Sequence, residues 1–128
     1  MRVPFRFSRL SLAVALSAAG AGACNVFEPR PVEVNGETAT SFSVAVGREI
    51  DLSMQTIGPG SYAVPPTLAG SAVAYLEVTM RLQDPGGLTQ VFHFRGVEPG
   101  TTVITFEQID NNTPGFPHVN IVDTVTVR

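Results

Sequence analysis

After residue 37, apolar and polar residues alternate along the chain with a period of two. In the first such run, Phe42, Val44 and Val46 are separated by serine and alanine. Because successive side chains of a strand point to opposite faces, each run predicts a β-strand with one buried face. The runs cover residues 41–46, 50–55, 76–82, 89–97, 102–106 and 119–127.

Turn-forming residues separate these runs. Asp84-Pro85-Gly86-Gly87 and Glu98-Pro99-Gly100 each combine a proline, which fixes φ, with a glycine, which permits positive φ. Six or seven short strands joined by such turns are typical of an antiparallel β-sandwich. We therefore predict an all-β fold over residues 37–128, large enough to bury one core without a disulfide or a metal.

The first 23 residues differ in composition from the rest of the chain. Arg2, Arg6 and Arg9 are cationic, and the 14 residues from Leu10 to Ala23 are apolar or small. An apolar stretch of this length is too short to span a bilayer as a helix. A basic start followed by such a stretch predicts a secretory signal peptide at residues 1–23.

The segment ends in Ala21-Gly22-Ala23-Cys24, and Cys24 is the only cysteine of the chain. This motif resembles the lipobox of bacterial lipoproteins. The resemblance implies cleavage before Cys24, acylation of its side chain and attachment to the membrane of the cell envelope, with Asn25 favouring the outer membrane. Residues 24–36 contain two prolines and are expected to form an extended tether between the lipid and the domain.

Charge excludes one large class of partners. All eight basic residues are Arg, and three of them precede Cys24. The remaining five Arg face 11 acidic residues, so the mature chain has a side-chain charge of −6. An acidic chain without a cluster of basic residues is not expected to bind nucleic acid.

Two segments resemble bacterial immunoglobulin-like repeats. Phe94 to Thr105 contains a Gly-Val pair, a Pro-Gly turn and a threonine-rich strand in the order found in those repeats. Gly70-Ser71-Ala72-Val73-Ala74 resembles their middle segment. The resemblance implies an immunoglobulin-like antiparallel β-sandwich, of the kind that serves as a spacer, adhesive element or interaction module of the envelope.

The chain also resembles the chagasin-like inhibitors of papain-type cysteine proteases, which are immunoglobulin-like sandwiches. Ser43 to Gly47, followed by Ile50-Asp51-Leu52, is similar to their opening strands. Gly86 to Phe94 is similar to their Gly-Gly turn and the aromatic strand after it. Those inhibitors fill the protease cleft with three loops from one end of the sandwich. The resemblance therefore implies three binding loops here, at residues 56–62, 84–88 and 110–117.

These loops hold the candidate protein-binding residues. They are Gly58, Pro59, Gly60, Ser61, Tyr62, Asp84, Pro85, Gly86, Gly87 and Phe116. Two interpretations of Tyr62 are open. A rigid Pro-Gly turn could present it to a partner, or the ring could cover the edge of the core. Phe116 has the same two interpretations.

The sequence contains no catalytic, cofactor or metal signature. His93 and His118 are the only histidines, and neither has the spacing of a metal ligand. His93 is expected to face solvent or a cross-strand partner, and no Gly-x-Ser-x-Gly nucleophile motif is present. Asp110-Asn111-Asn112 could offer oxygen ligands to calcium or simply form a turn.

These observations predict a membrane-anchored, non-catalytic lipoprotein that acts as a protein-binding or structural module of the envelope. The alternative is a chagasin-like inhibitor of papain-type cysteine proteases, which would use the same three loops. In both cases the expected partner is an envelope or secreted protein, and no cofactor is expected.

Overall fold

In the computed structural model, the chain is described at residues 29–55, 60–83, 87–110 and 119–128. The predicted signal peptide, Cys24, Phe116 and most residues of the three predicted loops lie outside this part. Within it, no helix is long and apolar enough to cross a membrane. The elements are β1 (Val32–Asn35), η1 (Gly36–Thr38), β2 (Ser41–Val44), β3 (Glu49–Gln55), β4 (Gly60–Tyr62), β5 (Thr67–Ala69), β6 (Val73–Gln83), β7 (Gly87–Gly96), β8 (Gly100–Asp110) and β9 (Asn120–Val127).

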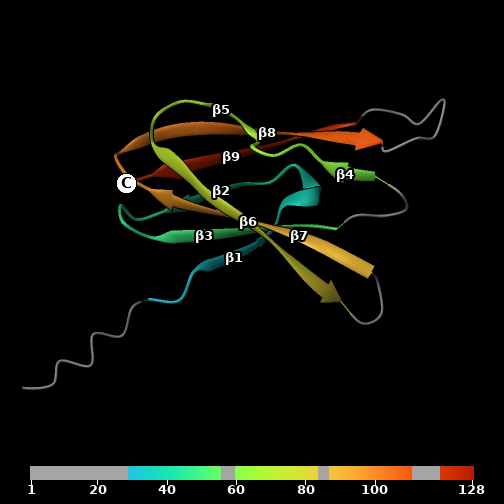
Figure 1. Ribbon diagram of the computed structural model, residues 1–128. Helices are drawn as coiled ribbons and strands as arrows, with labels where there is room; N and C mark the ends of the chain where they lie inside the picture. Colours follow the sequence, from blue (N-terminus) through green and yellow to red (C-terminus); the bar gives the residue numbers. More distant parts are fainter. Residues whose placement is uncertain (1–28, 56–59, 84–86, 111–118) are drawn as a thin grey trace, which may run out of the picture.

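The strands form two layers (Figure 1). Sheet A has the order β1-β3-β7-β6, and sheet B has the order β2-β9-β8-β4, with β5 also paired to β8. The predicted immunoglobulin-like β-sandwich is confirmed. The described residues hold nine strands instead of six or seven, and both sheets are mixed, because β1 pairs parallel to β3 and β2 pairs parallel to β9.

The sandwich begins earlier than we predicted. Val32 and Val34, which we placed in the tether of residues 24–36, lie in β1 and pack against the core. The chain then crosses from sheet A to sheet B through η1, which Asn35 caps by accepting a hydrogen bond from the Glu37 N–H (3.0 Å). Only two apolar residues alternate in this strand, between prolines and a polar turn, so its pattern is too short to recognise.

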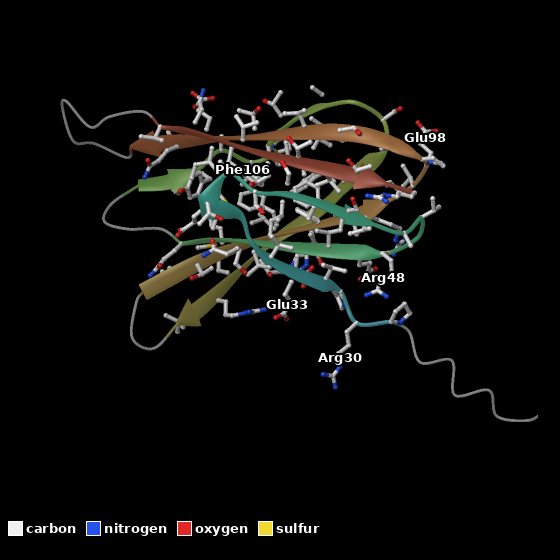
Figure 2. All side chains as sticks on the ribbon, turned by 180° about the vertical axis from the view of Figure 1, so that it is seen from behind. Arg30, Glu33, Arg48, Glu98 and Phe106 are labelled. Atoms are coloured by element: carbon white, nitrogen blue, oxygen red, sulfur yellow. The ribbon has the colours of Figure 1, made fainter. Side chains whose placement is uncertain are left out.

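Phenylalanine rings join the two sheets. Phe106 of β8 contacts Phe92 of β7 edge to face, with ring centroids 4.9 Å apart, and Phe94 at 6.4 Å. Figure 2 shows Phe106 between the layers. All three rings are fully buried, as are Ile50 and Leu52 of β3. The alternation in the sequence therefore identified the core side of β3 and β7, whereas the core side of β8 comes from the structure.

The last part of β6 departs from that pattern. Met80 is 55 % exposed and Leu82 is 81 % exposed, although both occupy the apolar phase of their run. They pair with Gln90 and Leu88 in a hairpin that runs out beyond the rest of sheet A, toward the lower right of Figure 1. An apolar face is buried only where another layer covers it, and sheet B does not cover the end of this hairpin.

One acidic residue lies inside the sandwich. Asp123 of β9 is completely buried opposite Ile104, in the phase of the apolar residues of its strand. Its Oδ1 accepts a hydrogen bond from the Thr40 N–H (2.8 Å), whereas Oδ2 has no hydrogen-bond partner among the described residues. Burial raises the pKa of Asp123 from 3.8 to about 6, and the Thr40 hydrogen bond opposes that shift.

The raised pKa of Asp123 predicts a pH-dependent stability. Between about pH 4 and pH 6 the carboxyl is protonated in the folded chain but ionised in the unfolded chain. The folded state then binds more protons, so this group makes the free energy of unfolding fall as pH rises through that window. Asp123→Asn stays neutral and keeps the acceptor for Thr40. We expect it to be more stable than the parent by roughly 2–3 kcal/mol at pH 7 and by little at pH 4.

Urea unfolding at several pH values measures this difference. Glu107→Gln, on the exposed face of β8, is the matched control and should leave the pH profile of the parent unchanged. A stability difference between Asp123→Asn and the parent that is independent of pH would contradict the assignment.

Candidate protein-binding end

The strand ends that border the three predicted loops lie together. Gln83 of β6 pairs with Gly87 of β7, and Gln55 of β3 pairs with Thr89 of β7. In sheet B, Gly60 of β4 pairs with Asp110 of β8. Figure 1 shows all these strand ends on the right, opposite the C-terminus. We call this part of the sandwich the loop end.

A buried glutamine ties the two sheets together at the loop end. The Gln90 side chain of β7 accepts a hydrogen bond from the Tyr62 N–H (2.7 Å) and donates one to the Tyr62 carbonyl (3.2 Å). Gln90 is only 5 % exposed, so these bonds are shielded from water. They fix the short strand β4 of sheet B against sheet A. Gln90 is not among the residues predicted from the sequence, although a glutamine in phase with Phe92 and Phe94 is a polar group expected in the core.

Tyr62 is part of the core and is not an exposed contact residue. Its side chain is 6 % exposed, and its ring meets that of Phe106 edge to face at 6.3 Å. Burial, with a smaller contribution from Glu37, raises the pKa of the Tyr62 hydroxyl. Of its two sequence interpretations, the structure therefore selects the ring that covers the edge of the core.

The other candidate residues have these positions. Gly60 and Ser61 lie in β4, Gly60 being buried, and Gly87 begins β7. Outside the described residues lie Gly58, Pro59, Asp84, Pro85, Gly86 and Phe116.

Both chain ends leave the sandwich at the opposite end, which we call the far end. Val32 of β1 pairs with Ile50 near the start of β3, and the Arg128 N–H donates to the Val44 carbonyl (3.0 Å). Arg48 donates to the Arg30 carbonyl (3.1 Å) and so holds the entering chain there. Since β8 has 11 residues, the loop end and the far end are about 35 Å apart.

Polar side chains form a hydrogen-bonded row on the outer face of sheet A. His93 Nδ1 lies 2.7 Å from Asp51 Oδ1, and His93 Nε2 lies 2.8 Å from Thr79 Oγ1. The expectation of a cross-strand partner for His93 is confirmed. The order hydroxyl, imidazole, carboxylate is that of a hydrolase triad, but here it crosses three adjacent strands on the face of a sheet. Its direct effect is to tie β3, β7 and β6 together.

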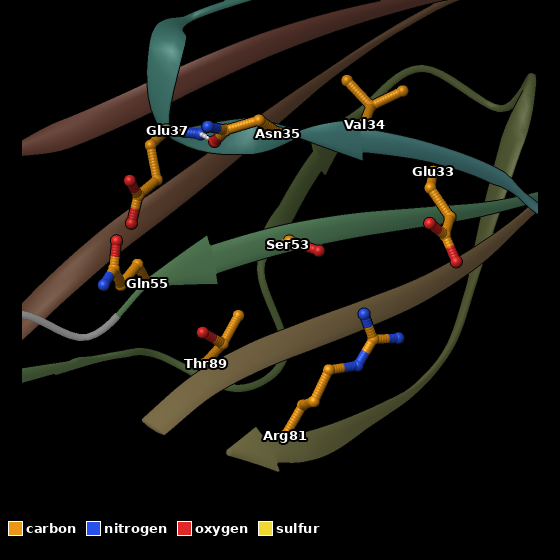
Figure 3. A pocket seen from close by; sticks show the side chains of 8 residues that line it. All are labelled: Glu33, Val34, Asn35, Glu37, Ser53, Gln55, Arg81 and Thr89. Atoms are coloured by element: carbon orange, nitrogen blue, oxygen red, sulfur yellow. Dashed lines mark hydrogen bonds between the residues drawn. The ribbon is translucent and has the colours of Figure 1, made fainter. Parts of the chain in front are cut away.

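A polar hollow of about 270 Å³ lies over the same face (Figure 3). Glu33 of β1, Ser53 of β3 and Arg81 of β6 all line it. It is also lined by Val34, Asn35, Glu37, Gln55 and Thr89. Among the described residues, no group of three or more His, Cys, Asp or Glu side chains could hold a metal ion. Asn111 and Asn112 of the possible calcium loop lie outside them.

Comparison with known proteins supports the β-sandwich fold and does not identify a binding partner. No protein-family model and no curated protein sequence matches the chain. The solved structure of the cysteine protease inhibitor EhICP2 from Entamoeba histolytica superimposes with a TM-score of 0.59 at 12 % identity, over 76 % of this chain and 94 % of that chain. The solution structure of amebosin gives a TM-score of 0.49 at 12 % identity, over 78 % and 100 % of the two chains.

The contact between Gln90 and Tyr62 predicts a specific loss of stability at the loop end. Gln90→Met keeps the length of the side chain but leaves the Tyr62 N–H and carbonyl buried without partners. We expect the free energy of unfolding to fall by about 1–3 kcal/mol, with faster hydrogen exchange at the Tyr62 amide. Glu33→Met, at an exposed position of β1, is the control. Unchanged exchange at Tyr62 in Gln90→Met would show that the contact does not hold β4.

Proposed function

We propose that this chain is a non-catalytic binding module whose loop end enters the active-site cleft of a papain-type cysteine protease and inhibits it. The observation that carries this proposal is the convergence of the strand ends around residues 56–59, 84–86 and 111–118 at one end of the sandwich. The similarity of the fold to a cysteine protease inhibitor over 94 % of that inhibitor's chain supports the same function.

The packing of the loop end favours tight binding. A segment that is ordered before it meets its partner loses less conformational entropy on binding. Here β4 is fixed by the Gln90 side chain and by the contact of Tyr62 with Phe106, directly beside residues 56–59. β6 and β7 are paired as far as Gln83 and Gly87, on either side of residues 84–86.

The position of the chain ends supports the further proposal of a lipid anchor at Cys24. Eight residues, 24–31, precede β1, and they span at most roughly 27 Å when extended. They enter the sandwich at the far end, so a lipid-anchored domain would present its loop end away from the membrane surface. The proposed location is the envelope of a bacterium, with the outer membrane favoured as the membrane that holds the acyl chains.

Inhibition is tested by titrating papain with the chain from residue 25 onward, which contains every described strand and the whole described core. We expect reversible inhibition of peptide hydrolysis. Replacing residues 56–59 by Gly-Ser-Gly-Ser, or Gly86 and Gly87 by alanine, should raise the inhibition constant by about tenfold or more, which is about 1.4 kcal/mol.

Control variants separate binding from folding in this experiment. Glu98→Ala, in the turn before β8 at the far end, should inhibit like the parent. Tyr62→Ala is not a suitable probe, because removing a buried ring lowers stability by about 3–5 kcal/mol. Folded protein that gives no inhibition at about 10 μM would refute the inhibitor proposal and leave a binding module for another envelope protein.

Acylation is tested separately by expressing the full chain in a bacterial host. The parent should partition into the detergent phase of Triton X-114, because acyl chains add apolar surface that a sandwich of this kind does not expose. Cys24→Ala should remain in the aqueous phase or keep its signal segment. Equal partitioning of the parent and a Cys24→Ala protein that has lost its signal segment would contradict a lipid at this position.

A further inference from the structure

The longest free strand edge of sheet A belongs to β6. In the described part of the chain β6 is the last strand of the order β1-β3-β7-β6, and it is 11 residues long. It contains no proline, and its one irregularity lies between Tyr75 and Glu77. From Glu77 to Gln83 it is a regular strand with β7 on one side only. Such an edge can add another strand through main-chain hydrogen bonds.

The direction of these main-chain groups follows from β7. The Gly96 N–H donates to the Arg48 carbonyl (2.9 Å), and the Gly96 carbonyl accepts from the Gly47 N–H (2.7 Å). The main chain of Gly96 therefore faces the β3 side of the strand. Because this direction alternates along a strand, the main chain of Val91, five residues earlier, faces β6.

Val91 pairs with Thr79, so the N–H and carbonyl of Thr79 point toward β7. The main-chain groups of Val78, Met80 and Leu82 then point away from the sheet, toward the open edge. None of these three has a hydrogen bond to another described residue beyond the pairing of its strand.

Two charged side chains of β6 also lack partners within the described residues, although Thr79 between them bonds His93. Glu77 and Arg81 are exposed, and neither makes an ion pair or a side-chain hydrogen bond within the described residues. Both lie on the outer face of sheet A, where Glu77 pairs in register with His93 and Arg81 with Thr89. On the inner face, Met80 and Leu82 are exposed beyond the cover of sheet B. The edge is therefore bordered by charge on one face and by apolar side chains on the other.

The sequence of β6 is complementary to itself when it is turned around Thr79. In an antiparallel pair centred on this residue, Glu77 lies opposite the partner's Arg81, and Arg81 lies opposite the partner's Glu77. On the other face, Val78 lies opposite the partner's Met80. Centring the pair on Val78 or on Met80 places neither charge opposite the other. Only the Thr79 register makes two opposite-charge pairs, which favour pairing, and keeps like charges apart.

The main-chain directions agree with this register. Across the new edge, Thr79 would face the partner's Thr79 as a pair without main-chain hydrogen bonds, since both use these groups within their own sheets. Val78 and the partner's Met80 would form the adjacent hydrogen-bonded pair, because both point their N–H and carbonyl outward. Hydrogen-bonded and non-hydrogen-bonded pairs alternate in this way in antiparallel sheets.

From these observations we propose that β6 is a dimerisation edge: two copies of the chain pair their β6 strands antiparallel about Thr79 and join their four-stranded sheets into one of eight strands. The two-fold axis passes between the Thr79 residues, perpendicular to the sheet. The two loop ends then point in opposite directions. This inference does not depend on protease binding.

Analytical ultracentrifugation of the chain from residue 25 onward tests the proposal. We expect a monomer–dimer equilibrium with a dissociation constant in the micromolar range, because few side chains are buried between the copies. Glu77→Arg alone places two arginines opposite each other, and Arg81→Glu alone places two glutamates opposite each other. Each single variant should dimerise at least about tenfold more weakly than the parent.

Recombining the charges distinguishes this register from any other association. An equimolar mixture of Glu77→Arg and Arg81→Glu should form a heterodimer, since every arginine then meets a glutamate. The double variant Glu77→Arg/Arg81→Glu should dimerise like the parent. In Met80→Pro the outward N–H is lost without breaking a bond to β7, so this variant should stay monomeric while its urea midpoint shows that it is folded.

Two results would overturn the proposal. One is a parent that remains monomeric up to about 500 μM, far above a micromolar dissociation constant. The other is association of the single charge variants with the affinity of the parent, or no gain on mixing them. Either result would show that the copies do not pair through β6 in this register.

Discussion

The contact of Phe106 with Phe92 and Phe94 is the constraint on which the rest of the structure depends. These rings are fully buried and bring the middle strands of the two sheets together. The chain has a single cysteine, so no intrachain disulfide can hold the layers. Burial of apolar side chains between the sheets must supply most of the stability, and it fixes which strands lie above which.

Two buried polar side chains, those of Gln90 and Asp123, also affect the packing of the two sheets and its stability. Gln90 satisfies both main-chain groups of Tyr62 and so gives β4 a defined place at the loop end. Within the described part of the chain, Asp123 has a partner for only one carboxylate oxygen, and it opposes folding when it is ionised. Gln90 therefore fixes the strand beside the proposed binding surface, whereas Asp123 makes the stability of the domain depend on pH.

The three surfaces of the sandwich have separate proposed uses. Its far end receives the chain from the predicted membrane anchor, and its loop end carries the predicted binding segments. The edge of β6 lies along the side between them, where Glu77 and Arg81 have no partners within the described chain. Pairing through this edge would cover Met80 and Leu82, which are among the apolar side chains left exposed near the loop end.

The sequence by itself determined the all-β class, most strands and the core positions Ile50, Leu52, Phe92 and Phe94. The alternation of apolar and polar residues indicates on which face of its strand a side chain lies, and it depends only on neighbouring residues of the chain. This pattern does not predict how far the opposite sheet extends over that face. Only the tertiary structure decided that Tyr62 is buried, that Met80 and Leu82 are exposed and that Val32 to Asn35 form a strand. Each of these depends on contacts with residues distant in the chain, which no local pattern contains.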